Sequence, residues 1–154
     1  MASDVAQRGS YLICRVGACL CGLPLEHVVE TMRPLPLDPL AGAPAFVSGV
    51  SLIRGRPVPI VDAGLLLGVE QASPSRLISI KAGGGVVALA VEGVLGVRFI
   101  PDDALDELPP LLDGAGGDVI DALGMLDSAL LVLLQHGHLV PESVWTLVEG
   151  QESS

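Results

Sequence analysis

The amino-acid sequence predicts an all-β fold of two small five-stranded barrels that share one core, with short helices. Glycine and proline recur at short intervals along the 154 residues, 19 and 12 times respectively. The apolar stretches between them are short and rich in Val, Ile and Leu, as in strands of a barrel or sandwich. Halves of this size are marginally stable alone, so a shared core is the economical arrangement.

The first barrel is expected over about residues 10–68. Its predicted strands are 11–16, 19–23, 25–32, 50–53 and 56–61. The last two strands form a hairpin around Arg54-Gly55, and a polyproline II crossing over 33–44 precedes a possible helical turn at 45–49. Because Pro57 and Pro59 lack an N–H, the strand that holds them has one unpaired edge. Asp62 and Gly68 are placed to cap and end a short helix.

The second barrel is expected over about residues 75–135, after a polar seam at 68–75. Its predicted strands are 76–82, 86–91, 94–100, 119–126 and 129–135. The last two strands form a hairpin about Asp127-Ser128, and the acidic stretch 101–118 is expected to be a mobile surface loop. Pro141 begins a helix over 141–149 in which Trp145 is partly covered. Residues 1–9 and 150–154 are expected to be flexible, which leaves one domain over 10–149.

Charge and apolar run length exclude several classes of function. The formal net charge is −10, from 18 acidic and 8 basic residues, and residues 99–154 hold 11 of the acids and none of the bases. A protein of this charge does not suit nucleic acid or an anionic membrane surface. No apolar run approaches the ~20 residues that span a bilayer. With no visible secretory signal and three cysteines, a cytoplasmic location is expected.

The residues offer little that is typical of catalysis. Ser48, His27 and Asp62 make a triad only on paper, because no Gly-x-Ser-x-Gly elbow is present. A small hydrolase or metal-dependent enzyme that uses Cys19, His27 and loop carboxylates is the alternative from another class.

A metal site is a poor match as well. Its candidate ligands are Cys14, Cys19, Cys21, His136 and His138. A Cys-x-Cys pair on a strand does not fit the turn-borne spacing of zinc ligands, so buried free cysteines are expected. We therefore expect no catalytic residue, cofactor or metal, and a binding or scaffolding module instead.

The stretch 43–62, Ala-Pro-Ala-Phe-Val-Ser-Gly-Val-Ser-Leu-Ile-Arg-Gly-Arg-Pro-Val-Pro-Ile-Val-Asp, resembles the signature of the CheW family of chemotaxis coupling proteins. Looser similarity extends over about residues 10–149. The residues in register are Phe46, Gly49, Val50, Arg54, Gly55, Pro59 and Asp62. The resemblance implies two SH3-like barrels and a non-catalytic adaptor. Its partners would be the cytoplasmic tip of a methyl-accepting chemoreceptor and the regulatory domain of a CheA-type histidine kinase, with no nucleic acid and no membrane insertion.

The same resemblance implies the protein-binding residues. Val28, Glu30, Gly49 and Arg54 would lie on the partner-facing surface, beside Gly55 and Val58. Glu30 and Arg54 are expected to pair on neighbouring strands, Gly49 to permit a positive φ or a close backbone approach, and Val28 and Val58 to offer apolar contact. The chain departs from the family at Leu52 and Ala63-Gly64, so an alternative is a scaffold that has lost kinase coupling and serves another pathway.

Overall fold

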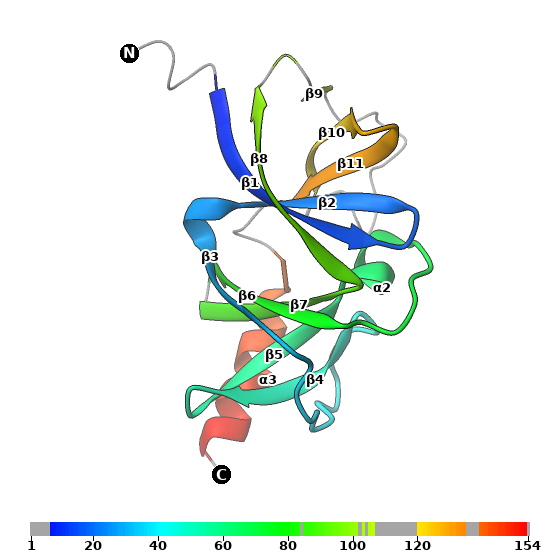
Figure 1. The fold of residues 1–154 in the computed structure, drawn as a ribbon. Coiled ribbons are helices and arrows are strands. Elements are labelled where there is room, and N and C mark those ends of the chain that lie inside the picture. The colour runs from blue at the N-terminus through cyan, green and yellow to red at the C-terminus, as the bar shows by residue number, and fades with distance from the viewer. Residues whose placement is uncertain are drawn as a thin grey trace.

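The computed structural model describes residues 7–83, 85–101, 103, 105–106, 120–134 and 139–153. The chain is mostly strand, which confirms the all-β prediction (Figure 1). The strands are β1 (Gln7–Val16), β2 (Cys19–Pro24), β3 (Val28–Met32), β4 (Val47–Ile53), β5 (Arg56–Asp62), β6 (Arg76–Ala82), β7 (Gly85–Val91), β8 (Gly93–Pro101), β9 (Leu105–Asp106), β10 (Ile120–Leu126) and β11 (Ala129–Leu134). The helices are the 3-10 turn η1 (Leu25–His27), α2 (Ala63–Leu67) and α3 (Glu142–Ser153).

Each of the two sheets takes strands from both halves of the chain. The six-stranded sheet has the order β8-β1-β2-β11-β10-β9, and the five-stranded sheet has the order β3-β6-β7-β5-β4. The expected division into consecutive barrels at 10–68 and 75–135 is therefore wrong. Parallel pairing of β11 with β2 and of β5 with β7 brings distant segments together, and no local pattern encodes such pairing.

The two sheets repeat one connectivity. In each, an edge strand, β3 or β8, pairs with the first strand of a hairpin, β6–β7 or β1–β2. The second strand of that hairpin pairs in parallel with β5 or β11, each of which closes another hairpin, β4–β5 or β10–β11. Two groups of five strands are thus present, with members that differ from those predicted, and the two-residue β9 adds a sixth strand to one of them.

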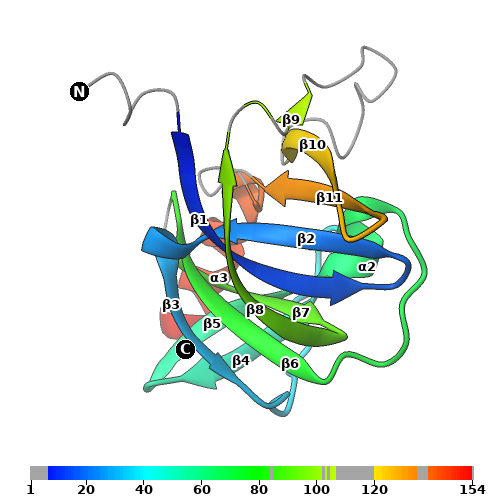
Figure 2. The same ribbon diagram turned by 45° about the horizontal axis from the view of Figure 1, so that its top comes forward.

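The two sheets are curled and lie one against the other (Figure 2). Three apolar clusters among the described residues explain this arrangement. The largest lies between the sheets and takes residues from both, which confirms the shared core. A second cluster lies within the six-stranded sheet, around Ile13 and Leu133. The third lies within the five-stranded sheet, where Met32 and Ile53 come from opposite edge strands. Burial of apolar side chains from both edges into one cluster curls each sheet toward a barrel.

Helix α3 covers the part of the five-stranded sheet in which β5 and β7 are not paired. The parallel ladder from β5 to β7 covers only Ile60–Asp62, so the strand residues before it lack a partner on that side, as their prolines predicted. Trp145 and Val148 of α3 share a lining with Pro57 and Val86 there. Trp145 is partly covered, as expected.

Several element boundaries differ from the prediction. The strand expected at 25–32 begins as η1 and becomes extended only at Val28, and β4 begins at Val47, where a helical turn was expected. Strand β1 already includes Gln7–Gly9, and α3 continues to Ser153, so strand and helix extend into both ends that were expected to be flexible. Most of the expected loop 101–118 lies outside the described residues.

The short helix α2 forms as its capping residues predicted. The Asp62 side chain accepts a hydrogen bond of 3.0 Å from the Leu65 N–H, and Gly68 ends the helix with a φ of +74°. None of the helices in the described part of the chain is long and apolar enough to cross a membrane.

Candidate protein-docking site

The Arg54-Gly55 turn stands at the exposed end of the β4–β5 hairpin, as predicted. Arg54 has a φ of +56° and Gly55 a φ of +80°, the pair of positive values that a type I′ turn requires. This turn matches the right-handed twist of the two strands. The Arg54 side chain is 78% exposed, so the hairpin presents a cation to the surroundings.

Glu30 holds the Arg54 guanidinium in a two-point interaction. Arg54 donates from Nε to Oε2 and from Nη2 to Oε1 of Glu30, both at 2.9 Å. These hydrogen bonds lower the pKa of the Glu30 carboxyl below its ordinary value and raise that of Arg54. The Glu30 side chain is 27% exposed, so the carboxylate fixes a guanidinium whose remaining donors face outward.

The expected pairing of Glu30 with Arg54 is present, but the two residues do not lie on neighbouring strands. Glu30 is on β3 and Arg54 follows β4, and these are the two edge strands of the five-stranded sheet. The ion pair therefore spans the gap between the edges and closes the barrel. The sequence separation of 24 residues gave no sign of this.

Gly49 has both properties that the sequence suggested, but it uses them inside the molecule. Its φ is +150°, and a Cβ atom there would come well under 3.0 Å from the Asp38 carbonyl oxygen. The Asp38 and Val50 backbones exchange two hydrogen bonds of 2.8 Å. Gly49 is buried and lets the 33–44 crossing lie against β4, so its expected place on a partner-facing surface is wrong.

Of the two valines expected to offer apolar contact, Val58 is buried and Val28 is partly buried. Val58 is only 4% exposed and belongs to the core of the five-stranded sheet, which contradicts its assignment to the docking surface. Val28 is partly buried against the core between the sheets. Strand β5 has cores on both of its faces, with Ile60 in one and Val61 in the other, so alternation does not place Val58 outside.

Leu52 is the exposed apolar residue beside the Arg54 turn. Its side chain is 69% exposed on β4, opposite Pro57 of β5. We name Glu30, Leu52, Arg54 and Gly55 the hairpin surface. The sequence held one indication of this surface. Leu52 is a departure from the family, which has a polar residue at this position.

A second apolar surface lies on the edge strand β8. Its side chains are Leu95, Val97 and Phe99, which are 55%, 51% and 50% exposed. They stand at alternate positions in the sequence, and we name them the β8 row. A register shift in the pairing with β1 falls at Leu95, so regular alternation holds only for Val97 and Phe99. Val97 lies opposite Leu12, and Leu12 faces the core between the sheets. Val97 and Phe99 of the β8 row therefore extend that core face past the covered area. The sequence showed the apolar alternation but not that β8 is an edge strand.

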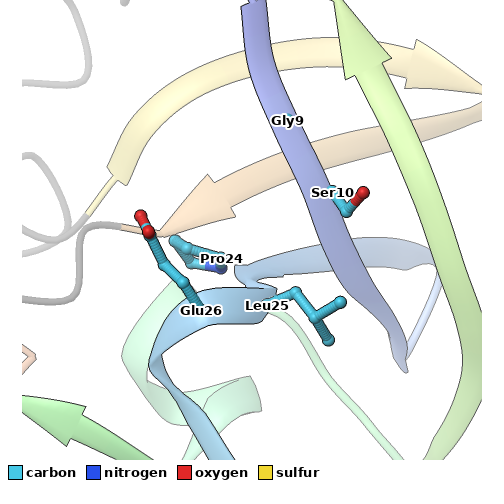
Figure 3. Close-up of a pocket in the computed structure, with 5 residues that line it drawn as sticks. All are labelled: Gly9, Ser10, Pro24, Leu25 and Glu26. Carbon is cyan, nitrogen blue, oxygen red and sulfur yellow. The ribbon is translucent and has the colours of Figure 1, made fainter. Parts of the chain in front are cut away.

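A hollow lies next to the β8 row (Figure 3). Gly9, Ser10, Pro24, Leu25 and Glu26 line this cavity of about 360 Å³. Ser10 lies opposite Phe99 of β8, and Leu25 is 39% exposed. In Figure 3 the Leu25 side chain extends beneath β1 toward the side on which β8 lies, whereas Glu26 extends to the opposite side. The hollow therefore borders the β8 row at the pair of Ser10 and Phe99.

The six-stranded sheet has a hairpin, β10–β11, with a turn of the same type. Asp127 and Ser128 have φ values of +50° and +66°, again the values of a type I′ turn. Arg98 of β8 donates to Asp127 at 3.2 Å, so an ion pair closes this sheet as Glu30–Arg54 closes the other. Met125 and Leu130 lie opposite each other on the hairpin and are both exposed. In one pair the turn residue is the base, Arg54, and in the other pair the turn residue is the acid, Asp127.

The hydrogen bonds of the Asp62 carboxylate do not support a catalytic triad of Ser48, His27 and Asp62. Oδ1 of Asp62 caps α2 and also accepts a hydrogen bond of 3.1 Å from Gln71, so this oxygen is used for structure. The His27 ring lies 3.6 Å from the Glu26 carboxylate, and Ser48 is exposed on β4.

Two of the three cysteines are apolar core residues as expected, whereas Cys19 is partly exposed. Cys14 and Cys21 lie directly opposite each other on β1 and β2, are fully buried and are free thiols. Burial raises the pKa of the Cys14 thiol to about 12 and that of Cys21 well above its ordinary value. Among the residues that the structure describes, no group of three His, Cys, Asp or Glu side chains is placed to hold a metal ion. His136 and His138 lie outside those residues.

Comparison with known families decides what this pair of curled sheets is. The model of the CheW-like domain matches residues 10–143, which is most of the chain. The chain belongs to the CheW-like domain family. The resemblance read from residues 43–62 is thereby confirmed, and the family is one of scaffolds and adaptors, so the chain is an adaptor of the chemotaxis type.

Individual relatives of this CheW-like domain support the assignment. It is 34% identical to the protein FrzA of Myxococcus xanthus over 117 residues, which is 74% of this chain and 72% of that one. It is 33% identical to a chemotaxis protein CheW of Rhizobium meliloti over 71% of this chain and 74% of that one. The scaffolding protein TtCheW of Thermoanaerobacter tengcongensis has the same fold, with a TM-score of 0.73 at 19% identity over 85% of this chain and 91% of that one.

Proposed function

We propose that this CheW-like domain joins the cytoplasmic tip of a methyl-accepting chemoreceptor to the regulatory domain of a CheA-type histidine kinase and catalyses no reaction. The observation that carries the proposal is the presence of two separate exposed surfaces on one body. The β8 row borders the junction of the sheets, and the hairpin surface stands at the end of the five-stranded sheet.

The β8 row suits the receptor tip. Exposed apolar side chains beside a hollow offer a surface on which an amphipathic helix can lay its apolar face. Leu95, Val97 and Phe99 are about half exposed, so they have surface left to bury. Burial of apolar area of this kind is the main favourable term in association.

The hairpin surface suits the kinase domain. Leu52 provides an apolar contact and Arg54 an oriented guanidinium, the combination that favours a specific polar interface around a small apolar centre. Docking at both surfaces is bivalent. Once one partner is bound within an assembly, the second contact becomes intramolecular, which raises avidity by roughly 10²–10⁴. Such docking takes place in the cytoplasm.

Co-sedimentation tests the proposal. Membranes that contain the receptor are mixed with the kinase and with each variant. We expect Val97→Asp to abolish sedimentation with the receptor and to leave kinase binding unchanged, and Leu52→Asp to do the reverse. Leu65→Asp is the matched control, because Leu65 is 60% exposed on α2 and belongs to neither surface.

Two outcomes would contradict the proposal. If Val97→Asp and Leu52→Asp both bind the two partners as the parent chain does, neither surface is a docking site. Hydrolysis of a substrate by the purified chain would overturn its non-catalytic part. Binding of the receptor without binding of the kinase would favour the alternative of an adaptor for another pathway.

A further inference from the structure

The proline-rich crossing between β3 and β4 is exposed and is not used by the proposed function. Residues 33–39 read Arg-Pro-Leu-Pro-Leu-Asp-Pro. Prolines fix their own φ, and the residue before each proline is pushed to extended conformations. Six of these seven residues are therefore either proline or directly before one, and the segment has a polyproline II bias along its length.

The protein holds this segment in place along β4. Asp38 exchanges two backbone hydrogen bonds of 2.8 Å with Val50, and the Ser51 hydroxyl donates to the Pro36 carbonyl at 2.8 Å. Leu35 packs against the core of the five-stranded sheet. The segment is thus ordered before any partner arrives, so a partner does not have to supply that ordering free energy.

The anchors decide which side chains face outward. A polyproline II helix returns to the same face every three residues, so Leu35 and Asp38 share the face toward β4. In that conformation Arg33, Pro36 and Pro39 share another face. All three are exposed, as are Pro34, Leu37 and Asp38, so the shared face follows from the threefold period and not from exposure alone. We name Arg33, Pro36 and Pro39 the proline ridge. A role in covering the edge of β4 would explain the two hydrogen bonds between Asp38 and Val50. It would not explain why exposed proline rings stand three residues apart.

Pairing of a partner strand with this segment is disfavoured. Pro34, Pro36 and Pro39 have no N–H, and the Asp38 N–H is already bonded to Val50. A partner strand would find too few donors for a ladder. Recognition must therefore use the side chains, and the chemistry that recognises proline rings at this spacing is a groove lined by aromatic residues.

We propose that the proline ridge docks into an aromatic-lined groove of a polyproline-binding domain in a partner protein. Pro36 and Pro39 stack on the aromatic side chains, and Arg33 meets an acidic side chain at one end of the groove. The pattern Arg-x-x-Pro-x-x-Pro gives the interaction one direction. This inference does not depend on receptor or kinase binding, because the ridge shares no residue with the hairpin surface or the β8 row.

A titration with a defined probe tests the inference. The probe is a ¹⁵N-labelled SH3 domain that selects Arg-x-x-Pro-x-x-Pro ligands, and the full chain is added to it. We expect saturable chemical-shift changes confined to the aromatic groove and its acidic edge. The double variant Pro36→Ala with Pro39→Ala should bind at least about tenfold more weakly, and Arg33→Gln about threefold more weakly.

The controls separate docking from folding. Alanine at position 36 keeps the carbonyl that accepts from Ser51, so the double variant should retain the melting temperature of the parent chain. Pro44→Ala removes a proline of the same crossing that lies off the ridge, and it should leave probe binding unchanged. Equal binding by the parent chain and the double variant would overturn the inference, as would the lack of any saturable shift. Weaker kinase binding by the double variant without SH3 binding would also overturn it, and would place the ridge in the coupling surface.

Discussion

Glu30 and Arg54 join the two edge strands of the five-stranded sheet through two hydrogen bonds of 2.9 Å. The pair closes the barrel at the same end where the hairpin surface is exposed. Arg98 and Asp127 make the corresponding contact in the other sheet, with the charges exchanged. Closure of the barrel and display of a guanidinium are therefore two results of one contact.

The first prediction concerns Arg54→Ala. Because the guanidinium is exposed, its loss should leave the melting temperature nearly unchanged, while the affinity for the kinase domain falls about tenfold or more. Arg54→Lys should recover only part of the affinity, since an ammonium group lacks the two-point geometry. Calorimetric titration and a thermal melt of each variant provide the two measurements.

Arg76→Ala is the matched control for Arg54→Ala. Arg76 is also exposed, donates to the Ser75 carbonyl at 2.8 Å, and lies at the start of β6. It should leave both the affinity and the melting temperature unchanged. An equal loss of both quantities in Arg54→Ala would show that this arginine is structural.

The second prediction is a dependence on pH. Hydrogen bonds from Arg54 lower the folded-state pKa of Glu30 below 4.5, the ordinary value for a glutamate. The contribution of the pair to stability is therefore complete above that ordinary value and is lost as the pH falls through the lowered pKa. It is small, because solvent screens the pair.

Nuclear magnetic resonance follows this titration directly. The carboxyl carbon of Glu30 should titrate below pH 4.5 in the parent chain. In Arg54→Gln the midpoint should return toward the ordinary value. A midpoint that stays in place in the variant would mean that Arg54 is not the cause of the lowered pKa.

How much of this site the sequence predicts depends on how local each feature is. The Arg54-Gly55 turn, the hairpin about Asp127-Ser128 and the Asp62 cap are set by neighbouring residues, and all three were predicted correctly. The assignment of strands to sheets was wrong because it depends on pairs such as Leu131 with Leu20, which no local pattern encodes.

The same reasoning explains which site residues were misplaced. Val58 was assigned to the surface through the family resemblance, but β5 has a core on each of its faces, so this residue is buried. The β8 row was missed for the opposite reason. Its apolar alternation is typical of a half-buried strand, and only the tertiary structure shows that the opposing sheet stops short of Leu95, Val97 and Phe99.

The third prediction is that Gly49→Ala destabilises the fold. The new Cβ would overlap the Asp38 carbonyl, and a φ of +150° is unfavourable for alanine. We expect a loss of more than about 1 kcal/mol in the free energy of unfolding, measured by urea denaturation. Gly93→Ala is the control, since no atom lies within 4 Å of a Cβ there. If the two variants were equally stable, the close approach of the crossing to β4 would have no energetic weight.

The fourth prediction concerns thiol reactivity. The thiolate is the reactive form, and burial raises the pKa of Cys14 to about 12, so roughly one Cys14 side chain in ten thousand is ionised at pH 8. Cys21 is fully buried and has its pKa raised as well, whereas Cys19 is partly exposed.

A thiol reagent at pH 8 should therefore modify Cys19 in the native chain within minutes and reach Cys14 and Cys21 only on unfolding. Mass spectrometry of the native chain should show one modification, and the chain in urea should show three. The Cys19→Ser variant should react only in urea, and rapid modification of that variant without denaturant would show that the core between the sheets opens in the native state.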